Sequence, residues 1–253
     1  MIQAVTFDFW GTLYSEIEGI YQRRRLLRYE YSQDFFQAQG REVTFTQLEF
    51  AFDILSRQIE HLRLERQVGI NAEELGLHLG RTIGVELEAD KARELGELIS
   101  ITGRECPPAP MDGAKALLEA LRGRVKTAVI SDTGMTLGPD LYSVMERDRV
   151  AQLLQQFTFS DQTGTTKPQS RQFLYTLHKL GVAPEAAVHV GDLEDADVIG
   201  AKGVGMRAIR IVRPGSNSHS LADAVVSSVC GVLPVLEQWG LPKSMPGSSR
   251  KSP

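Results

Sequence analysis

The chain has 253 residues, of which 42% are hydrophobic and 24% charged, and this composition predicts a globular protein rather than a disordered one. Its formal net charge is −4, so there is no general positive field to attract nucleic acid or an anionic membrane. Cys106 and Cys230 fit neither a metal-binding spacing nor a disulfide framework. We find no secretory signal and no apolar run of membrane-spanning length, and we expect a cytoplasmic protein with reduced thiols.

The first predicted element is a buried strand over Ile2–Phe9, which runs into a loop at Gly11-Thr12. Strand-like runs are then absent up to about residue 103. Apolar residues recur there at spacings of three and four, which predicts helices. Two of the predicted helices begin with capping boxes, in which two side chains bond each other's backbone amides. The pairs are Thr46 with Glu49 and Asn71 with Glu74.

Strands and helices alternate again after the stiff segment Pro107-Pro108-Ala109-Pro110. Short runs rich in valine and isoleucine predict strands, and two amphipathic stretches that end near glycines predict helices. The strands are Val125–Ile130, Ala186–Val190 and Arg207–Val212, and the helices are Ala114–Leu121 and Arg171–Leu180. This alternation predicts an α/β fold with a doubly wound parallel sheet, interrupted in sequence by an all-helical insertion.

The domain organisation follows from these elements. We assign residues 1–15 and 106–240 to the α/β core and residues 16–105 to the inserted helical domain. Residues 241–253 are rich in proline, glycine and serine, so we expect them to form a disordered tail.

Acidic and polar residues follow the predicted strands. In a parallel α/β sheet, ligands bind at the carboxyl ends of the strands, so we expect these side chains to meet at one edge. Carboxylates gathered beside one lysine repel one another unless a hard divalent cation neutralises them, and we expect that cation to be Mg²⁺. The residues concerned are Asp8, Ser131, Asp132, Lys167, Asp192 and Asp197.

At these residues the chain resembles the haloacid dehalogenase-like hydrolase superfamily, through four motifs in the family's order. The motifs are Asp8-Phe9-Trp10-Gly11-Thr12-Leu13, Val129-Ile130-Ser131, Lys167-Pro168, and Gly191-Asp192 followed by Asp197. The predicted helical insertion lies directly after the first motif, where the commonest cap class of this family sits. The resemblance implies a Rossmann-like core, a helical cap, and a hydrolase whose small-molecule substrate is held at their junction.

The resemblance also implies a role for each motif residue. Asp8 would attack the substrate, while Ser131 and Lys167 would bind and neutralise the transferred group. The backbone of Gly11 and Thr12 would donate to its oxyanion, and Asp132 would lie beside the substrate. The implied magnesium ligands are Asp8, the backbone carbonyl of Trp10 and Asp192, with Asp197 supporting them.

Trp10 departs from the pattern of phosphatases in this superfamily, which place a second aspartate two residues after the nucleophile to protonate the leaving group. An indole cannot transfer a proton near neutral pH, and general acid–base catalysis typically contributes about 10²- to 10⁴-fold. The favoured hypothesis is a magnesium-dependent phosphohydrolase that forms an aspartyl-phosphate on Asp8 from a small phosphorylated metabolite. Its substrate would have a good leaving group, or another residue such as Asp132 would act as the general acid.

Two alternatives stay open. In the first, the chain is similar to 2-haloacid dehalogenases and forms an ester on Asp8, and a cap arginine holds the substrate carboxylate. In the second, it is a weakly catalytic ligand-binding or regulatory protein. The dense carboxylates favour metal-dependent chemistry over the dehalogenase. We interpret the candidate arginines as a solvated helix face, and His189 as a core residue of the sheet. The arginines are Arg23, Arg24, Arg25 and Arg28.

Overall fold

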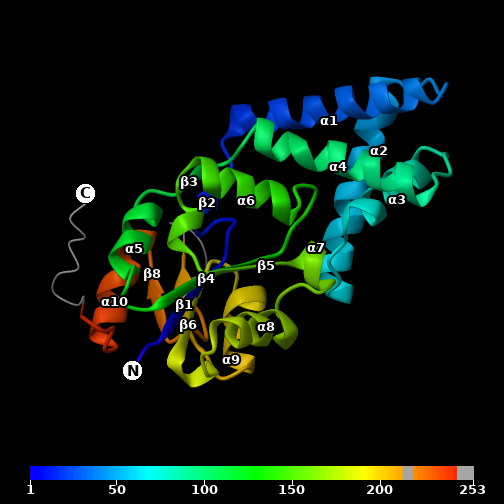
Figure 1. Ribbon diagram of the computed structural model, residues 1–253. Helices are drawn as coiled ribbons and strands as arrows, with labels where there is room; N and C mark the ends of the chain where they lie inside the picture. The colour runs from blue at the N-terminus through cyan, green and yellow to red at the C-terminus, as the bar shows by residue number, and fades with distance from the viewer. Residues whose placement is uncertain (213–218, 244–253) are drawn as a thin grey trace, which may run out of the picture.

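The structure is a computed structural model and describes residues 1–212 and 219–243. Its centre is a six-stranded sheet with the order β5-β4-β1-β6-β7-β8 (Figure 1). Every neighbouring pair in this sheet is parallel. The strands are β1 (Ala4–Phe7), β4 (Lys126–Ser131), β5 (Gln156–Phe159), β6 (Ala187–Gly191), β7 (Arg207–Ile211) and β8 (Ala224–Val226).

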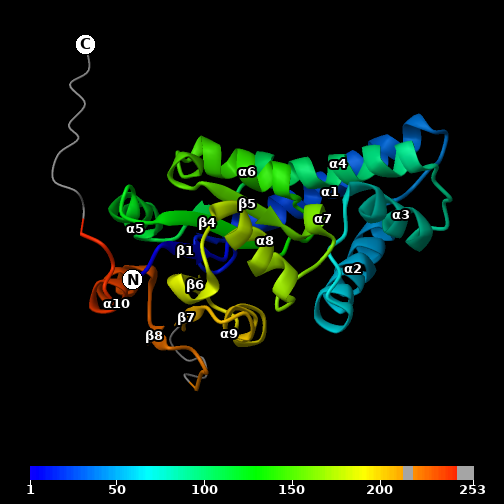
Figure 2. The same ribbon diagram turned by 60° about the horizontal axis from the view of Figure 1, so that its bottom comes forward.

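Helices cover both faces of the sheet, which confirms the predicted doubly wound α/β fold. Apolar side chains of α5, α6 and α10 pack on one face, and those of α8 and α9 pack on the other. Figure 2 shows the sheet between these two layers. The helices are α5 (Ala114–Leu121), α6 (Gly138–Arg147), α7 (Ser160–Thr163), α8 (Ser170–Leu180), α9 (Ile199–Gly203) and α10 (Val232–Gln238).

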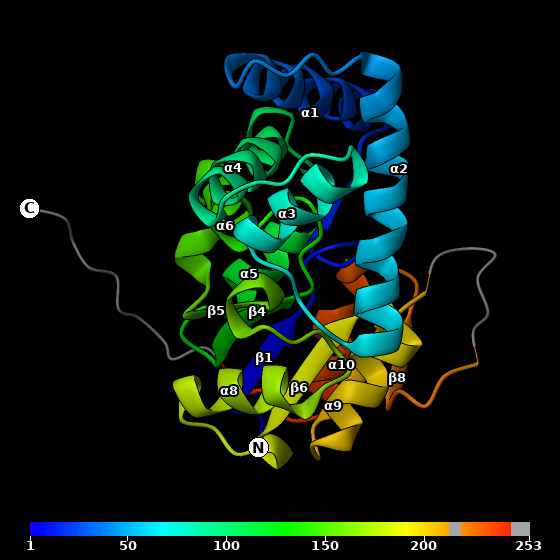
Figure 3. The ribbon, with the colours of Figure 1, turned by 90° about the vertical axis from the view of Figure 1, so that its right-hand side faces the viewer.

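The segment between β2 and β3 is entirely helical and has an apolar core of its own, built around Phe36, Leu55, Leu75 and Leu95. Figures 1 and 3 show its helices gathered at one end of the molecule, outside the layers that cover the sheet. They are α1 (Glu18–Ala38), α2 (Phe45–His61), the π-helix η1 (Leu62–Arg66), α3 (Ala72–Thr82) and α4 (Ala89–Glu105). That this segment is a separate cap domain stays a prediction.

Several local expectations differ from the structure. The capping box of α2 is formed by Thr44 and Gln47, two residues before the predicted pair, because the helix begins at Phe45. The box of Asn71 and Glu74 is present as predicted. The proline-rich segment is not only a linker, since β3 (Ala109–Pro110) pairs antiparallel with β2 (Tyr14–Ser15).

The predicted C-terminal tail begins with residues that pack. Leu241 is buried in the apolar core beside α10, and the Arg124 side chain donates to the Pro242 carbonyl at 2.6 Å. Residues 244–253 lie outside the described residues. Within the described part of the chain, no helix has the length and hydropathy needed to cross a membrane.

The strand order brings the predicted site residues to one edge of the sheet. β1 lies between β4 and β6, and Phe7 is in register with both Val129 and Val190. Asp8 therefore emerges level with the ends of the two neighbouring strands. The chain winds in opposite directions on either side of β1, and such a switch point leaves a crevice at the carboxyl ends of the strands.

Candidate active site

Asp8 and Lys167 form a buried ion pair at the end of β1. Asp8 is 5% exposed, and its backbone amide donates to the Val190 carbonyl at 2.9 Å. Lys167 Nζ donates to Asp8 Oδ1 at 2.5 Å and to Asp197 Oδ1 at 2.6 Å. One ammonium group thus joins two residues that are far apart in sequence.

Asp197 is held by further donors. His189 Nε2 lies 3.1 Å from Asp197 Oδ1, and the backbone amide of Leu193 donates to Asp197 Oδ2 at 3.0 Å. His189 Nδ1 in turn lies 2.8 Å from the Thr6 hydroxyl. His189 is fully buried within the sheet, as predicted, but it also orients the carboxylate that holds Lys167. A histidine inside a strand gave no sequence signal for this second role.

The carboxylates form a cluster that suits a hard cation. One oxygen each from Asp8, Asp192 and Asp197 lies within 4.8 Å of the others. Gly11 has a φ of +77°, which favours glycine, and a Cβ atom built there would displace the Asp192 carboxylate from its present position. Such an all-oxygen donor set is typical of Mg²⁺ and Ca²⁺ sites. The part of the Trp10 carbonyl in this site stays a prediction.

Burial and the neighbouring charges shift the pKa values of the groups in the cluster in opposite directions. Burial, opposed by Lys167, raises the pKa of Asp8 well above its ordinary value. Burial alone would lower the pKa of Lys167, but the carboxylates of Asp197, Asp8 and Asp132 together raise it. Lys167 and His189 outweigh the burial of Asp197 and lower its pKa. When all three clustered carboxylates are ionised, their formal charge of −3 exceeds the +1 of Lys167 by two, which is the charge of one divalent cation.

The residues expected to bind the transferred group lie around this cluster. Ser131 is fully buried at the end of β4, and its hydroxyl donates weakly to the Asp132 carbonyl at 3.4 Å. The Gly11 amide donates to the Tyr14 carbonyl at 2.7 Å, so donation to an oxyanion would require that bond to open. Among the described residues, the buried Thr12 hydroxyl has no hydrogen-bond partner. These three binding roles stay predictions.

A cavity of about 420 Å³ lies between the sheet edge and the helical segment. Trp10 and Asp132 line it from the sheet, and residues of α1, α2 and η1 line it from the other side. Asp132 Oδ1 accepts a hydrogen bond from the Lys167 backbone amide at 2.9 Å. Burial, opposed by Lys167, raises the pKa of Asp132 to about 6. Asp132 is therefore a titratable group beside Trp10 in the same cavity.

Arg63 lines this cavity and was not identified in the sequence. Its guanidinium donates to Glu60 at 2.8 and 3.2 Å, and its side chain is 20% exposed. The hydrogen bond to Glu60 is the largest cause that raises the pKa of Arg63, and the charges of Asp132 and Asp8 add to it. Arg63 lies on the π-helix η1, whose irregular turn places it toward the sheet edge and which no periodic pattern predicts.

The prediction that the four arginines of α1 form a solvated helix face is wrong for Arg24 and Arg28. Arg24 is 2% exposed and Arg28 is 8% exposed, whereas Arg23 is exposed and Arg25 is half-buried. Both buried arginines lie on the side of α1 that faces the end of α4: Arg24 Nε donates to the Cys106 carbonyl, and Arg28 Nε to the Thr102 hydroxyl. The charge pattern alone could not reveal which side of the helix is covered.

Comparison with known proteins identifies the family. A sequence model of the haloacid dehalogenase-like hydrolases matches residues 2–205. The chain belongs to the haloacid dehalogenase-like hydrolase family. This agrees with the motifs at the ends of β1, β4 and β6 and with the parallel sheet that carries them.

Relatives of this haloacid dehalogenase-like chain include the haloacid dehalogenase-like hydrolase domain-containing protein 3 of Bos taurus. The two are 31% identical over 133 residues, which cover 50% of this chain and 51% of the relative. A phosphoserine phosphatase of Thermus thermophilus is 35% identical over 129 residues, which cover 49% and 48% of the two chains. The matched region thus spans about half the length of these relatives.

Solved structures share the fold of this family member over nearly its whole length. A HAD phosphatase from Thermococcus onnurineus superposes with a TM-score of 0.64 at 21% identity, covering 95% of this chain and 99% of the other. A 2-haloacid dehalogenase from Pseudomonas syringae pv. Tomato DC3000 gives a TM-score of 0.66 at 23% identity, covering 94% and 100%. At this identity the likeness shows the fold alone.

Proposed function

We propose that this haloacid dehalogenase-like protein is a magnesium-dependent phosphohydrolase that acts on a small phosphorylated metabolite through an aspartyl-phosphate on Asp8. The observation that carries the proposal is the buried cluster in which Lys167 joins Asp8 to Asp197 while Asp192 lies beside them. Relatives named phosphoserine phosphatase and glyceraldehyde 3-phosphate phosphatase support this reaction class.

The donor set suits the proposed cation. Asp8, Asp192 and Asp197 offer oxygens within 4.8 Å of one another, and the Trp10 carbonyl is the further candidate ligand. Mg²⁺ bound there would polarise the transferred phosphoryl group and neutralise its charge. When the three carboxylates are ionised, their formal charge exceeds that of Lys167 by two, which a divalent ion balances and a monovalent ion does not.

In the proposed reaction, an Asp8 oxygen attacks phosphorus and forms the aspartyl-phosphate, while the bond from phosphorus to the leaving oxygen breaks. Lys167 Nζ, 2.5 Å from the Asp8 carboxylate, compensates the negative charge of the transferred group. Ser131 and Thr12 bind its oxygens. Water then attacks phosphorus, the bond to Asp8 breaks, and inorganic phosphate leaves with Asp8 restored.

Asp132 is the proposed source of the proton that Trp10 cannot supply. It lines the same cavity as Trp10 and directly follows β4, the neighbour of the strand that carries Asp8. A pKa of about 6 leaves a usable protonated fraction near neutral pH. Asp132 would give its proton to the leaving oxygen and later take one from the attacking water.

A dehalogenase is the second candidate, and the observation that favours it is Trp10 in the cavity wall. A halide leaves as an anion and needs no general acid, so a tryptophan at that position would not slow the departure of the leaving group. The carboxylate cluster argues against this reading, because a metal-free ester mechanism gains nothing from Asp192 beside Asp8.

An activity screen tests these alternatives. The purified protein is assayed with Mg²⁺ or with EDTA against p-nitrophenyl phosphate, acetyl phosphate and 2-chloropropionate, and both phosphate and chloride release are recorded. We expect magnesium-dependent phosphate release. Chloride release that is indifferent to EDTA would support the dehalogenase, and inactivity on every substrate would support a ligand-binding or regulatory protein.

A further inference from the structure

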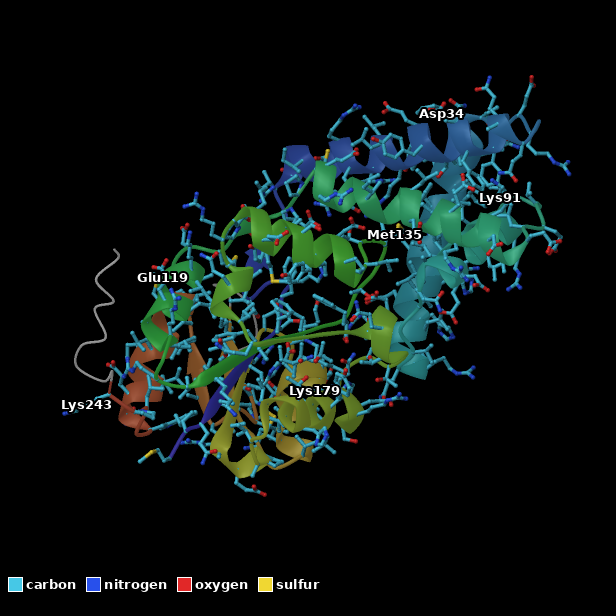
Figure 4. All side chains as sticks on the ribbon, viewed as in Figure 1. Asp34, Lys91, Glu119, Met135, Lys179 and Lys243 are labelled. Atoms are coloured by element: carbon cyan, nitrogen blue, oxygen red, sulfur yellow. The ribbon has the colours of Figure 1, made fainter. Side chains whose placement is uncertain are left out.

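The loop that carries Lys167 lies between the sheet and the helical segment. This loop, residues 164–169, connects α7 to α8 and is called the Lys167 loop below. On the side of the sheet, the Lys167 backbone amide donates to Asp132 Oδ1 at 2.9 Å, and Lys167 Nζ donates to Asp8. In Figure 4 the end of α2, from which η1 continues, lies beside α7 and this loop.

On the side of the helical segment, the Gln67 carbonyl accepts two hydrogen bonds from the Lys167 loop. The Thr166 backbone amide donates to it at 3.1 Å and Gln169 Nε2 at 3.0 Å. Thr166 directly precedes Lys167, so a displacement of the Gln67 carbonyl would displace the backbone of Lys167 as well.

The end of η1 and the Lys167 loop also touch at other points. The Thr166 hydroxyl donates to the Arg63 carbonyl at 3.2 Å, and the Gly69 amide donates to the Gly164 carbonyl at 3.3 Å. A Cβ atom built on Gly69 would overlap the Ser160 carbonyl, so the two backbones are in contact there. Arg63 lines the 420 Å³ cavity. The same short helix therefore forms part of the cavity wall and supports the Lys167 loop.

Gln67 has a backbone conformation that is uncommon for a residue with a side chain. Its φ is +52° and its ψ is +41°, in the left-handed region. Such a conformation persists where the surrounding structure requires it. Here it ends η1, and the carbonyl of the same residue accepts both bonds from the Lys167 loop.

We propose that Gln67 and Gln169 are positioning residues for Lys167, so that the end of η1 fixes where the ammonium meets the transferred group. This inference rests on the proposed phosphohydrolase function. Neither residue has a part in the proposed bond-making steps. Their effect on the rate would come through Lys167, because a displacement of about 1 Å in a reacting group can lower a rate about a hundredfold.

Gln169→Met tests the side-chain contact, because methionine has a similar length and no donor. With p-nitrophenyl phosphate and Mg²⁺, we expect kcat to fall about tenfold while KM changes less than about twofold, since Lys167 stabilises charge in the transfer step. Gln33→Met is the matched control, because Gln33 Nε2 donates to the Val43 carbonyl at 2.8 Å within the helical segment. It should keep both constants of the unaltered protein.

Two variants that both remove the Gln67 side chain test its backbone. A β-branched residue is a strong outlier in the left-handed region, so Gln67→Val should move the carbonyl and lower kcat about tenfold. Glycine adopts this conformation readily, so Gln67→Gly should restore kcat to within about twofold of the unaltered protein.

Hydrogen exchange of single amides, followed by NMR in EDTA, gives a readout that needs no turnover. In Gln169→Met and Gln67→Val, the Thr166 and Lys167 amides should exchange about tenfold faster or more. The Asp8 amide, which donates to Val190 within the sheet, should keep its rate in both variants.

The proposal is overturned if folded Gln169→Met keeps the kcat of the unaltered protein, or if its Lys167 amide exchanges no faster. Equal losses of kcat in Gln67→Val and Gln67→Gly would also overturn it, because the side chain rather than the carbonyl would then matter. If Gln67→Val does not fold, Gln169→Met decides. If no phosphate compound is hydrolysed, the proposed function fails separately, and the exchange rates alone support or refute the positioning of Lys167 by η1.

Discussion

At the scale of single residues, Asp8 shows how a reactive group is kept in an unfavourable environment. It is 5% exposed, and the carboxylates of Asp192 and Asp197 lie close by. Burial raises its pKa above the ordinary value of 3.8, so ionisation of Asp8 is less favourable in the folded state than in the unfolded chain. The stability that this group contributes is therefore full below pH 3.8 and is lost as the pH rises through its folded pKa.

Asp8→Asn removes the nucleophile and also this unfavourable charge. We expect phosphate release to fall by about a thousandfold or more. In EDTA at pH 7 the melting temperature of the variant should equal or exceed that of the unaltered protein, because the amide does not repel the carboxylates of Asp192 and Asp197. Calorimetry and a phosphate assay on the same preparation measure both effects. Activity at the level of the unaltered protein would contradict the nucleophile assignment.

Lys167 stabilises the folded state by pairing with the buried carboxylates. It pairs with Asp8 and Asp197 in a nearly dry site, so Lys167→Met would leave two buried carboxylates without their cation. We expect a loss of about 3–5 kcal/mol in the free energy of unfolding, measured with urea in EDTA. Lys202→Met is the control, because Lys202 pairs with Asp223 at the surface and should contribute less than about 1 kcal/mol. Equal losses in the two variants would refute the interpretation.

Asp132 should determine how the rate depends on pH. Its pKa is about 6, and only the protonated form can donate to a leaving group. For an alkyl phosphate, kcat/KM should therefore fall about tenfold per pH unit above pH 6. For p-nitrophenyl phosphate, whose leaving group needs no proton, this limb should be absent. Asp132→Asn should lower alkyl phosphate turnover selectively, and an equal loss on both substrates would argue against an acid role.

At the scale of elements, α3 and α4 pack through glycines. A Cβ atom on Gly76 would overlap the backbone of Ala92 in α4, and one on Gly96 would overlap the backbone of Ala72 in α3. The two helices can therefore approach until their backbones touch. This contact fixes the position of α4, which carries the Thr102 hydroxyl that accepts from Arg28.

Gly96→Ala tests this contact. We expect it to lower the free energy of unfolding by about 1–3 kcal/mol, because the added methyl group would force the helices apart. Gly19→Ala is the matched control: Gly19 lies in α1, and a Cβ atom there would meet no atom within 4 Å. That variant should be neutral or stabilised by up to about 1 kcal/mol through helix propensity. Urea unfolding of the two variants provides the comparison.

At the scale of the whole molecule, metal binding and folding should be linked. The carboxylates of the cluster come from the ends of β1 and β6 and from the π-helix η4 (Glu194–Val198), and only the folded chain brings them together. A cation that binds this arrangement therefore stabilises the entire fold.

Mg²⁺ at a hundred times its dissociation constant should raise the free energy of unfolding by about 2.7 kcal/mol. Differential scanning calorimetry with Mg²⁺ and with EDTA measures this as a rise in melting temperature. Asp192→Asn should abolish the rise, whereas Asp195→Asn, which removes an exposed acid outside the cluster, should retain it. A rise that survives in Asp192→Asn would place the ion elsewhere.

The main strands and the positions of the motif residues could be predicted from the amino-acid sequence. Buried strands leave continuous apolar runs, so β1, β4, β6 and β7 were located within a few residues, and the polar residues that follow them gave the candidate site. The outer strands β5 and β8 were missed, because strands at the edges of a sheet are partly exposed and carry a weaker apolar signal.

The surroundings of the site depend on the folding of distant segments against one another and could not be predicted from local patterns. Arg23, Arg24, Arg25 and Arg28 belong to one helix and look alike in sequence, yet two are buried and only Arg28 lacks an acidic partner among the described residues. The contact of His189 with Thr6 and the position of Arg63 across the cavity from Asp132 likewise depend on segments that are far apart in the chain. Local periodicity shows which side of an element is apolar, but the burial and pairing of a charge depend on the distant segment that covers it.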